Sequence, residues 1–454
     1  MQYTNSEPPS LLRGTNIFSR SLRWLLQANR PAPMLSEAQL AVEVERNYRW
    51  NFWFNMLDGV AFWLGLSFAS ASTIMPLFLS KLTPNPLAIG VLAVLAQGGW
   101  FLPQLFTANI VEQIPRKKPL VINVGFFLER LPFWAITGTA VLAATSPKIA
   151  VVLFLIAYAW HVVGAGVVAT AWQDLVARCF PVDRRGRFFG ITNFLGTGAG
   201  TLGAAISARL LTVASFPTNF VYTFALAAFL ITLSWVFLAQ TREPVQAITQ
   251  PPKSNREFWS KLLDIVRCDH NFRRFLIARM VMALGGMGGG FLTVAAVQRW
   301  HVPDGVVGLY TGVTLIGQTL GNLAFGFLAD RYGHKLSLVL GGVASVSGFA
   351  LAWLAPSPAW YYLVFTLLGI TTGALIVSGL LMVMEFSTAE RRPTYVGLAN
   401  TGIGLLGAIA PLLGAALVTL SYSWLFGVSA AVNLIALMLM WLWVKEPRQM
   451  RNAR

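Results

Sequence analysis

Long apolar stretches alternate with short polar segments along most of the chain. A helix needs about 20 apolar residues to cross the hydrocarbon core of a bilayer, and its backbone groups must be paired internally there. Twelve stretches meet this requirement, with approximate limits 52–79, 87–111, 120–143, 149–176, 188–213, 220–239, 275–298, 306–329, 336–355, 360–384, 395–420 and 424–444. The pattern therefore predicts an all-α membrane protein with twelve transmembrane helices.

Composition and the distribution of charge agree with this prediction. Of the 454 residues, 56% are apolar and 11% are charged, which is typical of multi-pass membrane proteins. The net charge of +16 raises the alternative of nucleic-acid binding. If the N-terminus of the chain lies inside, however, the only basic residues in the outer loops are Lys81, Lys148 and Arg299. This positive-inside bias predicts both termini in the cytoplasm, at the cytoplasmic (inner) membrane, and no nucleic-acid partner.

A polar loop with the sequence GFLADRYGHK, Gly326 to Lys335, has a weaker copy at Ala108 to Lys117. One constant shift aligns Glu112 with Asp330 and Lys117 with Lys335. A second echo aligns Asp183, Arg184 and Arg185 with Glu390, Arg391 and Arg392. The duplication predicts two pseudo-symmetric bundles of six helices.

The expected organisation has five parts: a cytoplasmic N-terminal segment (1–50), the first bundle (51–240), a cytoplasmic linker (241–274), the second bundle (275–445) and a cytoplasmic tail (446–454). Ser36 and Gln39 form a capping box that predicts a short helix toward Tyr48, lying along the inner membrane face. Apolar residues at helical spacing predict an interfacial amphipathic helix in the linker: Phe258, Trp259, Leu262, Leu263 and Val266. A simple solvated tether is the alternative for the linker.

The GFLADRYGHK loop resembles the signature of the major facilitator superfamily, in which a Gly-x-Leu-Ala-Asp-Arg-x-Gly-Arg-Lys segment joins helices 2 and 3 and recurs between helices 8 and 9. His334 departs from the signature, and Pro115 replaces a glycine in the first copy. The resemblance covers roughly residues 50 to 445 and identifies no subfamily. It implies a fold of two six-helix bundles and transport by alternating access.

The resemblance also implies a gating cluster on the cytoplasmic side. Asp330 is expected to lie against the N-terminus of helix 11, whose free N–H groups favour an anion, and Gly326 to let helices 8 and 11 approach closely. Together with Glu385, the charged residues of this cluster would close the cytoplasmic side in the outward-open state. The alternative is that they are solvated loop charges that only set the membrane topology. The residues expected in this gating motif are Gly326, Asp330, Arg331, Gly333, Lys335, Glu385, Arg391, Arg392, Glu112, Arg184 and Arg185.

Several ionisable residues fall inside predicted helices, where an isolated charge costs several kcal/mol. Asp58 in helix 1 is the better candidate for the central cavity, because the resemblance places helix 1 there and helix 3 at the periphery. Glu129 and Arg130 in helix 3 should point about 100° apart and need other partners. His161 in helix 4 is a candidate for proton coupling with Asp58, and a packing histidine is the alternative.

Further cavity candidates lie in the second half. Arg279 is suited to an anionic group, although its side chain can instead reach the inner membrane surface. Gln318 and Asn322 are polar enough to line a cavity but also suit contacts between helices. Five glycines between Gly285 and Gly290 predict a bend or break in helix 7 beside the substrate path, with close helix packing as the alternative.

The sequence contains no phosphate-binding Gly-x-x-x-x-Gly-Lys-Ser/Thr loop and no metal-ligand spacing. We therefore expect no enzymatic activity and no cofactor, and transport driven by an ion gradient. The hypothesis is a monomeric secondary transporter of a small molecule, coupled to protons. The alternative is a receptor, lipid scramblase or assembly factor of the same fold that does not transport.

Overall fold

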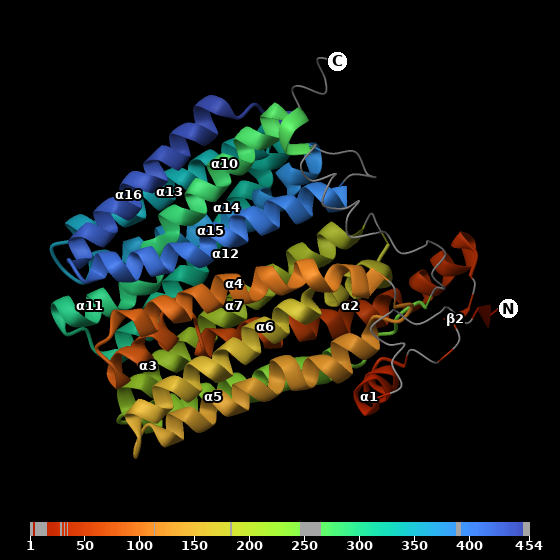
Figure 1. Cartoon of the computed structure of the whole chain (residues 1–454), viewed down its shortest axis with the longest axis horizontal. Helices are drawn as coiled ribbons and strands as arrows, with labels where there is room; N and C mark the ends of the chain where they lie inside the picture. The colour runs from red at the N-terminus through yellow and green to blue at the C-terminus, as the bar shows by residue number, and fades with distance from the viewer. Residues whose placement is uncertain are drawn as a thin grey trace.

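A computed structural model describes residues 3–4, 16–27, 30, 32–33, 35–112, 114–181, 184–245, 265–386 and 392–447. Apart from one antiparallel pair of two-residue strands, β1 (Tyr3–Thr4) and β2 (Ala32–Pro33), the elements of these residues are helices. Figure 1 shows the helices in two bundles, with both termini at the same end of the molecule. We call this the termini end, and the opposite one the far end.

The first bundle contains six helical segments, four of which are long and apolar enough to cross a membrane. Short helix α1 (Ile17–Leu25) lies beside it at the termini end (Figure 1). The bundle is formed by α2 (Glu37–Phe68), α3 (Ile74–Leu82), α4 (Pro86–Glu112), the π-helical turns η2 (Leu120–Val124) and η3 (Phe126–Arg130) that continue into α5 (Leu131–Leu142), α6 (Pro147–Cys179), α7 (Arg185–Val213) and α8 (Thr218–Leu238).

The second bundle repeats this arrangement. Its elements are α10 (His270–Gly285), the 3₁₀ turns η5 (Gly286–Phe291), α11 (Leu292–Trp300), α12 (Asp304–Tyr332), α13 (His334–Leu354), α14 (Trp360–Phe386), α15 (Arg392–Val418), α16 (Tyr422–Met438) and the π-helical turn η6 (Leu439–Trp443). The all-α fold of two bundles is thus confirmed.

Ten helical segments of the described chain are long and apolar enough to cross a membrane. The two other predicted spans, 52–79 and 188–213, are also helical and correspond to α2 with α3 and to α7. The first of these spans is unusually polar for a membrane helix, because Asn51, Asn55 and Asp58 lie in α2. All three are buried, so helix packing shields these polar groups.

Two expectations for the N-terminal region need correction. The Ser36 and Gln39 capping box is confirmed, with Gln39 N–H donating to Ser36 Oγ at 3.3 Å, but its helix does not end near Tyr48. It continues through α2 to Phe68, because the capping-box segment and the first span share one helical register. The first span itself is interrupted between Phe68 and Ile74, where one continuous helix was expected.

The interruption of the first span connects the two bundles. Thr73 Oγ1 lies 2.6 Å from Thr311 Oγ1 of α12, and Thr293 Oγ1 donates to Ser72 O at 3.2 Å. These bonds satisfy polar groups that a helix break exposes. Lys81 and Asp304 form an ion pair of 2.7 Å close to them. The bundles are therefore joined at the far end.

The glycine run in the seventh span produces the predicted break. Helix α10 ends at Gly285, and η5 carries the chain into α11. The glycines also allow close packing, since an added Cβ at Gly285 would lie 2.5 Å from Asn433 Nδ2. Both interpretations of the run therefore hold. The linker residues Phe258, Trp259, Leu262 and Leu263 lie outside the described residues.

Candidate functional site

Asp58 occupies the interior of the first bundle. Its side chain is buried at 6% exposure, and its Oδ1 accepts a hydrogen bond of 2.6 Å from Ser234 Oγ of α8. Arg130, in η3, is close enough to interact electrostatically with Asp58. The carboxylate therefore faces the spans formed by η3 with α5 and by α8.

Glu129 and Arg130 pair with each other, which corrects the expectation that they need separate partners. Arg130 Nη1 donates to Glu129 Oε2, and both side chains are buried. A π-helix has more residues per turn than an α-helix, so neighbouring side chains in η3 diverge less, and the long arginine side chain can reach back. Arg130 thus lies between the carboxylates of Glu129 and Asp58.

His161 of α6 joins the same cluster. Its Nδ1 lies 3.0 Å from the backbone oxygen of Glu129, and because a carbonyl can only accept, Nδ1 carries the hydrogen in this contact. The imidazole packs edge-on against Phe133, with ring centroids 4.4 Å apart. His161 is therefore well packed, yet it contacts the residue that pairs with Arg130. We call Asp58, Glu129, Arg130, His161 and Ser234 the first-bundle cluster.

Arg279 of α10 is the corresponding buried cation of the second bundle. It is 9% exposed, and its Nη1 lies 3.6 Å from Met282 Sδ. Met282 lies further along α10 than Arg279, away from the termini end. An added Cβ at Gly379 of α14 would lie 3.1 Å from Arg279 Nη2, and no described hydrogen-bond partner lies at Nε. The guanidinium thus points into the bundle, and the expected extension toward the inner surface is wrong.

Gln318 and Asn322 lie on α12 where this helix meets α14. The contact is close because Gly373 of α14 faces both residues, and an added Cβ there would lie 2.7 Å from Asn322 N and 2.8 Å from Gln318 O. Gln318 is buried, and Asn322 Oδ1 is buried without a described hydrogen-bond partner. This position favours a role of both residues in the contact between α12 and α14.

The signature loop between α12 and α13 is held by the C-terminal segment. Gly333 has φ of +94°, and an added Cβ would collide with the Glu446 carboxylate, so both conformation and space require glycine. Lys335 N–H donates to Glu446 Oε2 at 2.9 Å, and Lys335 Nζ donates to Trp441 O at 2.9 Å. Arg331 is exposed, with its guanidinium 5.3 Å from the Tyr332 ring centroid.

The expected gating cluster is described only in part. Glu385 Oε1 lies 3.6 Å from Nε2 of buried His334, the residue that departs from the family signature. An added Cβ at Gly326 would meet no described atom within 4 Å. The remaining members lie outside the described residues: Arg391, and the side chains of Glu112, Asp330 and Arg392.

In the first half, the equivalent charged residues have other partners. Arg184 Nη1 forms an exposed ion pair with Glu45 at 3.0 Å, and Arg185 Nε donates to Phe180 O at 3.1 Å. The contacts of Arg184 and Arg185 described here are thus within the N-terminal half.

Sequence reasoning missed a duplicated set of contacts at the termini end. Glu243 follows α8 and accepts hydrogen bonds from Lys117 N–H at 2.7 Å and Lys118 N–H at 3.0 Å. Asn51 forms two hydrogen bonds with the backbone of Arg242, and Asn271 forms the same two with Lys445. We call these arrangements the Glu243 clasp and the Glu446 clasp. The repeated triplets Arg-Glu-Pro at 242–244 and Lys-Glu-Pro at 445–447 were the available signal.

Burial changes the proton affinity of the Glu243 clasp. It raises the pKa of the Glu243 carboxyl, although the N–H donors of Lys117 and Lys118 oppose the shift. The same burial lowers the pKa of Lys117 to about 8, with Arg178 adding repulsion and Asp174 opposing it. Lys117 Nζ donates to Ile114 O at 2.6 Å and to Val111 O, and these bonds hold its ammonium group next to the Glu243 clasp.

Residues 275–454 match the family model described as Major Facilitator Superfamily. The chain is 33% identical over 184 residues to the 3-(3-hydroxy-phenyl)propionate transporter of Escherichia coli (strain K12), covering 38% of this chain and 42% of that protein. It is 25% identical over 183 residues to the 4-hydroxybenzoate transporter PcaK of Pseudomonas putida, covering 39% and 40%. The matches thus span about two fifths of these relatives.

Solved structures share the fold over most of the chain. The xylose transporter XylE from E. coli superposes with a TM-score of 0.63 at 15% identity, covering 88% of this chain and 98% of that one. A POT family transporter in complex with a peptide conjugate gives a TM-score of 0.66 at 13% identity, covering 86% and 95%. These similarities show a common fold.

Proposed function

We propose that this chain, whose residues 275–454 match the Major Facilitator Superfamily model, is a secondary active transporter of a small organic anion. The observation that carries the proposal is Arg279, a buried cation in the second bundle whose described contacts are not acidic. A buried charge without a protein partner is costly, so an anionic ligand would complete the site. Arg279 lies on α10, directly before the break at Gly286–Phe291.

The substrate class that we propose is an aromatic carboxylate. The names of two similar proteins, a 3-(3-hydroxy-phenyl)propionate transporter and a 4-hydroxybenzoate transporter, support this class. An arginine binds a carboxylate through two parallel hydrogen bonds, and it does so most strongly where water is excluded. Arg279 supplies such a group, with Met282 as a soft apolar neighbour.

We further propose that uptake is coupled to protons through the first-bundle cluster. Asp58 is its proton-exchanging group, because it is buried and Arg130 is shared between Asp58 and Glu129. Protonation of Asp58 would release Arg130 toward Glu129, and deprotonation would draw it back. This exchange changes a contact between the spans α2 and η3, which is the kind of rearrangement that alternating access requires.

The proposed topology follows the positive-inside bias, with the termini end in the cytoplasm and a monomer in the inner membrane. The links at Thr73, Thr311, Lys81 and Asp304 would then close the external side. The gating motif is proposed to act on the opposite side, where Glu385 and the loop charges lie.

Uptake by the purified protein in proteoliposomes tests the proposed function. Radiolabelled 4-hydroxybenzoate should accumulate when the external side is acidic, and collapse of the gradient should stop accumulation. Xylose serves as the neutral control and should not accumulate. Absence of flux for every aromatic acid would favour a protein that does not transport, whereas uptake of xylose alone would contradict the anionic substrate class.

A further inference from the structure

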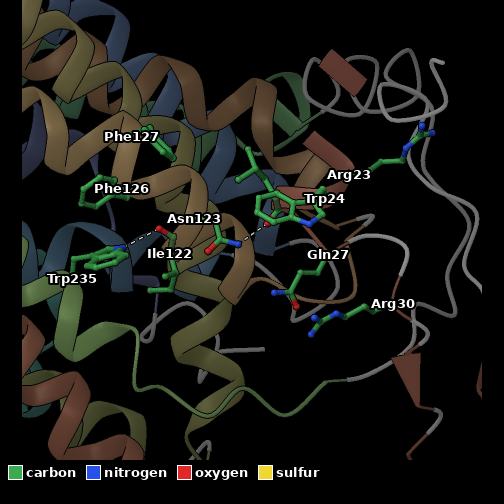
Figure 2. Close-up of a pocket in the computed structure, with 10 residues that line it drawn as sticks. Arg23, Trp24, Gln27, Arg30, Ile122, Asn123, Phe126, Phe127 and Trp235 are labelled. Carbon is green, nitrogen blue, oxygen red and sulfur yellow. Dashed lines mark hydrogen bonds between the residues drawn. The ribbon is translucent and has the colours of Figure 1, made fainter. Parts of the chain in front are cut away.

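A cavity of about 650 Å³ separates α1 from the membrane-spanning helices of the first bundle. Its lining residues are Arg23, Trp24, Leu25, Gln27, Arg30, Ile122, Asn123, Phe126, Phe127 and Trp235. Figure 2 shows the residues of α1 and the following turn on one side and those of η2, η3 and α8 on the other. The cavity is outside the first-bundle cluster and is not used by the proposed transport mechanism.

Hydrogen bonds fix both walls of this cavity. Asn123 Nδ2 donates to Leu25 O at 2.7 Å, which ties the end of α1 to η2 (Figure 2). Trp235 Nε1 donates to Ile122 O at 2.9 Å, which fixes the indole in the opposite wall. Arg116 Nη1 donates to Arg30 O at 2.7 Å and holds the turn after α1 near the membrane helices. The cavity is therefore a built feature of the fold.

The lining of the cavity combines basic and polar donors with apolar side chains. Two arginines and Gln27 supply donors, and none of the described lining residues is acidic. The helical wall is apolar, with Ile122, Phe126 and the Trp235 ring. Phe127 is 52% exposed and Trp24 77% exposed, so aromatic surface also lies open at the edge of the cavity. Such a combination suits a molecule with an anionic head and an apolar tail.

The position of the cavity indicates which kind of molecule would bind in it. Ile122 and Phe127 lie in the first turns of the span Leu120–Leu142, at the termini end, where a bilayer changes from headgroups to hydrocarbon. Helix α1 is short and amphipathic, with Arg20 and Arg23 as its charged residues and no acid in its sequence. Basic amphipathic helices of this type lie at the membrane surface and attract anionic lipids.

We propose that this cavity binds one anionic phospholipid, with its phosphate at the basic edge that Arg23 and Arg30 provide and an acyl chain along Phe126 and Phe127. The lipid would complete the contact between α1 and the third span. It would therefore stabilise the N-terminal segment against the bundle only in membranes that contain acidic lipid.

Native mass spectrometry of the detergent-purified full chain tests this proposal. Phosphatidylglycerol should bind on the order of tenfold more tightly than phosphatidylcholine, and the Arg23→Gln/Arg30→Gln variant should lose most of this preference. The matched control is Arg20→Gln/Arg46→Gln, which removes two exposed arginines that do not line the cavity. This control should keep the preference.

Three results would overturn the lipid site. Equal loss in both double variants would indicate diffuse surface charge. Equal affinity for glycerol 3-phosphate and phosphatidylglycerol would indicate a site for a soluble anion. If Arg23→Gln/Arg30→Gln keeps the full phosphatidylglycerol preference, and thermal unfolding confirms that this variant is folded, the two arginines do not bind the lipid phosphate. As a second variant, Trp24→Ala should weaken lipid binding without unfolding, because this side chain is largely exposed.

Discussion

Among the residues that the structure describes, each bundle buries one arginine, but the surroundings of these arginines differ. In the first bundle, Arg130 pairs with Glu129 and interacts with Asp58, so its charge is balanced within the protein. In the second bundle, Arg279 contacts Met282 Sδ and faces the backbone of Gly379. Two halves with one architecture therefore contain a cation paired with acidic residues in one and a cation without a described acidic partner in the other.

We propose that this difference reflects separate tasks of the two halves. A balanced cluster can shift its internal pairing when a proton is gained, without needing a ligand. An unbalanced arginine gains most from a bound carboxylate. We therefore expect substitutions in the second bundle to change substrate affinity and substitutions in the first bundle to change coupling.

Replacement of Arg279 by Ala should have the largest effect. Loss of a charge-assisted hydrogen bond to a buried carboxylate costs about 3 kcal/mol, on the order of a 100-fold rise in KM for 4-hydroxybenzoate. Arg279→Lys should restore part of the affinity because it keeps the charge. Initial uptake rates in proteoliposomes over a range of substrate concentrations provide the measurement.

The matched control for this prediction is Arg209→Ala, since Arg209 is an exposed arginine at the far end of α7. It should leave KM unchanged. A KM for Arg279→Ala equal to that of the control would show that Arg279 does not bind substrate. The two halves would then not be divided as proposed.

Replacement of Asp58 by Asn should separate coupling from binding. The amide keeps a hydrogen bond with Ser234 but cannot exchange a proton, so accumulation driven by a pH gradient should fall on the order of tenfold. Exchange of labelled for unlabelled substrate should remain within about twofold, because the site at Arg279 is intact. Ser234→Ala is the structural control and should retain gradient-driven accumulation; if it loses as much as Asp58→Asn, Asp58 is structural.

The fold was largely predictable because each span needs a long apolar stretch, and the duplicated loop identified the two halves. The break at Gly286–Phe291 was also predictable, since consecutive glycines weaken a helix. The break between Phe68 and Ile74 was not, because its cause is the contact of Thr73 with Thr311 in the other bundle. Long-range partners leave little trace in local hydropathy.

The candidate site shows the same limit. Asp58, His161 and Arg279 were identifiable as rare ionisable groups in apolar stretches. Their grouping was not, because the π-helical turn η3 that lets Glu129 reach Arg130 has no clear sequence signal. The sequence therefore supplied the members of the cluster but not their pairing.

The two clasps offer a second comparison of the halves. Glu243 accepts backbone hydrogen bonds from Lys117 and Lys118 through its two oxygens, whereas the described hydrogen bond of Glu446 comes from Lys335 to one oxygen, and its carboxylate lies against Gly333. A Gln side chain has one acceptor oxygen, so Glu243→Gln leaves one N–H facing an amide donor. It should cost about 1–3 kcal/mol and lower the apparent melting temperature by a few degrees.

Glu446→Gln is the matched variant for this comparison. Its oxygen can keep the hydrogen bond from Lys335, so we expect a smaller loss of stability than for Glu243→Gln. Thermal unfolding monitored by intrinsic fluorescence compares the two. A larger loss for Glu446→Gln would show that the contact with the signature loop dominates over the number of hydrogen bonds.

The smallest expected effect is a dependence of stability on pH that arises from Lys117. Its folded pKa is about 8, below the ordinary value of 10.5, because burial disfavours the ammonium. Between these values the unfolded chain binds more protons than the folded one, so the stability of the wild type should rise from about pH 8 to about pH 10.5. Lys117→Met should reduce this rise, whereas Lys445→Met, which removes an exposed lysine of the second half, should keep it. Identical pH profiles for wild type and Lys117→Met would show that Lys117 is protonated alike in both states, and would remove this difference between the two halves.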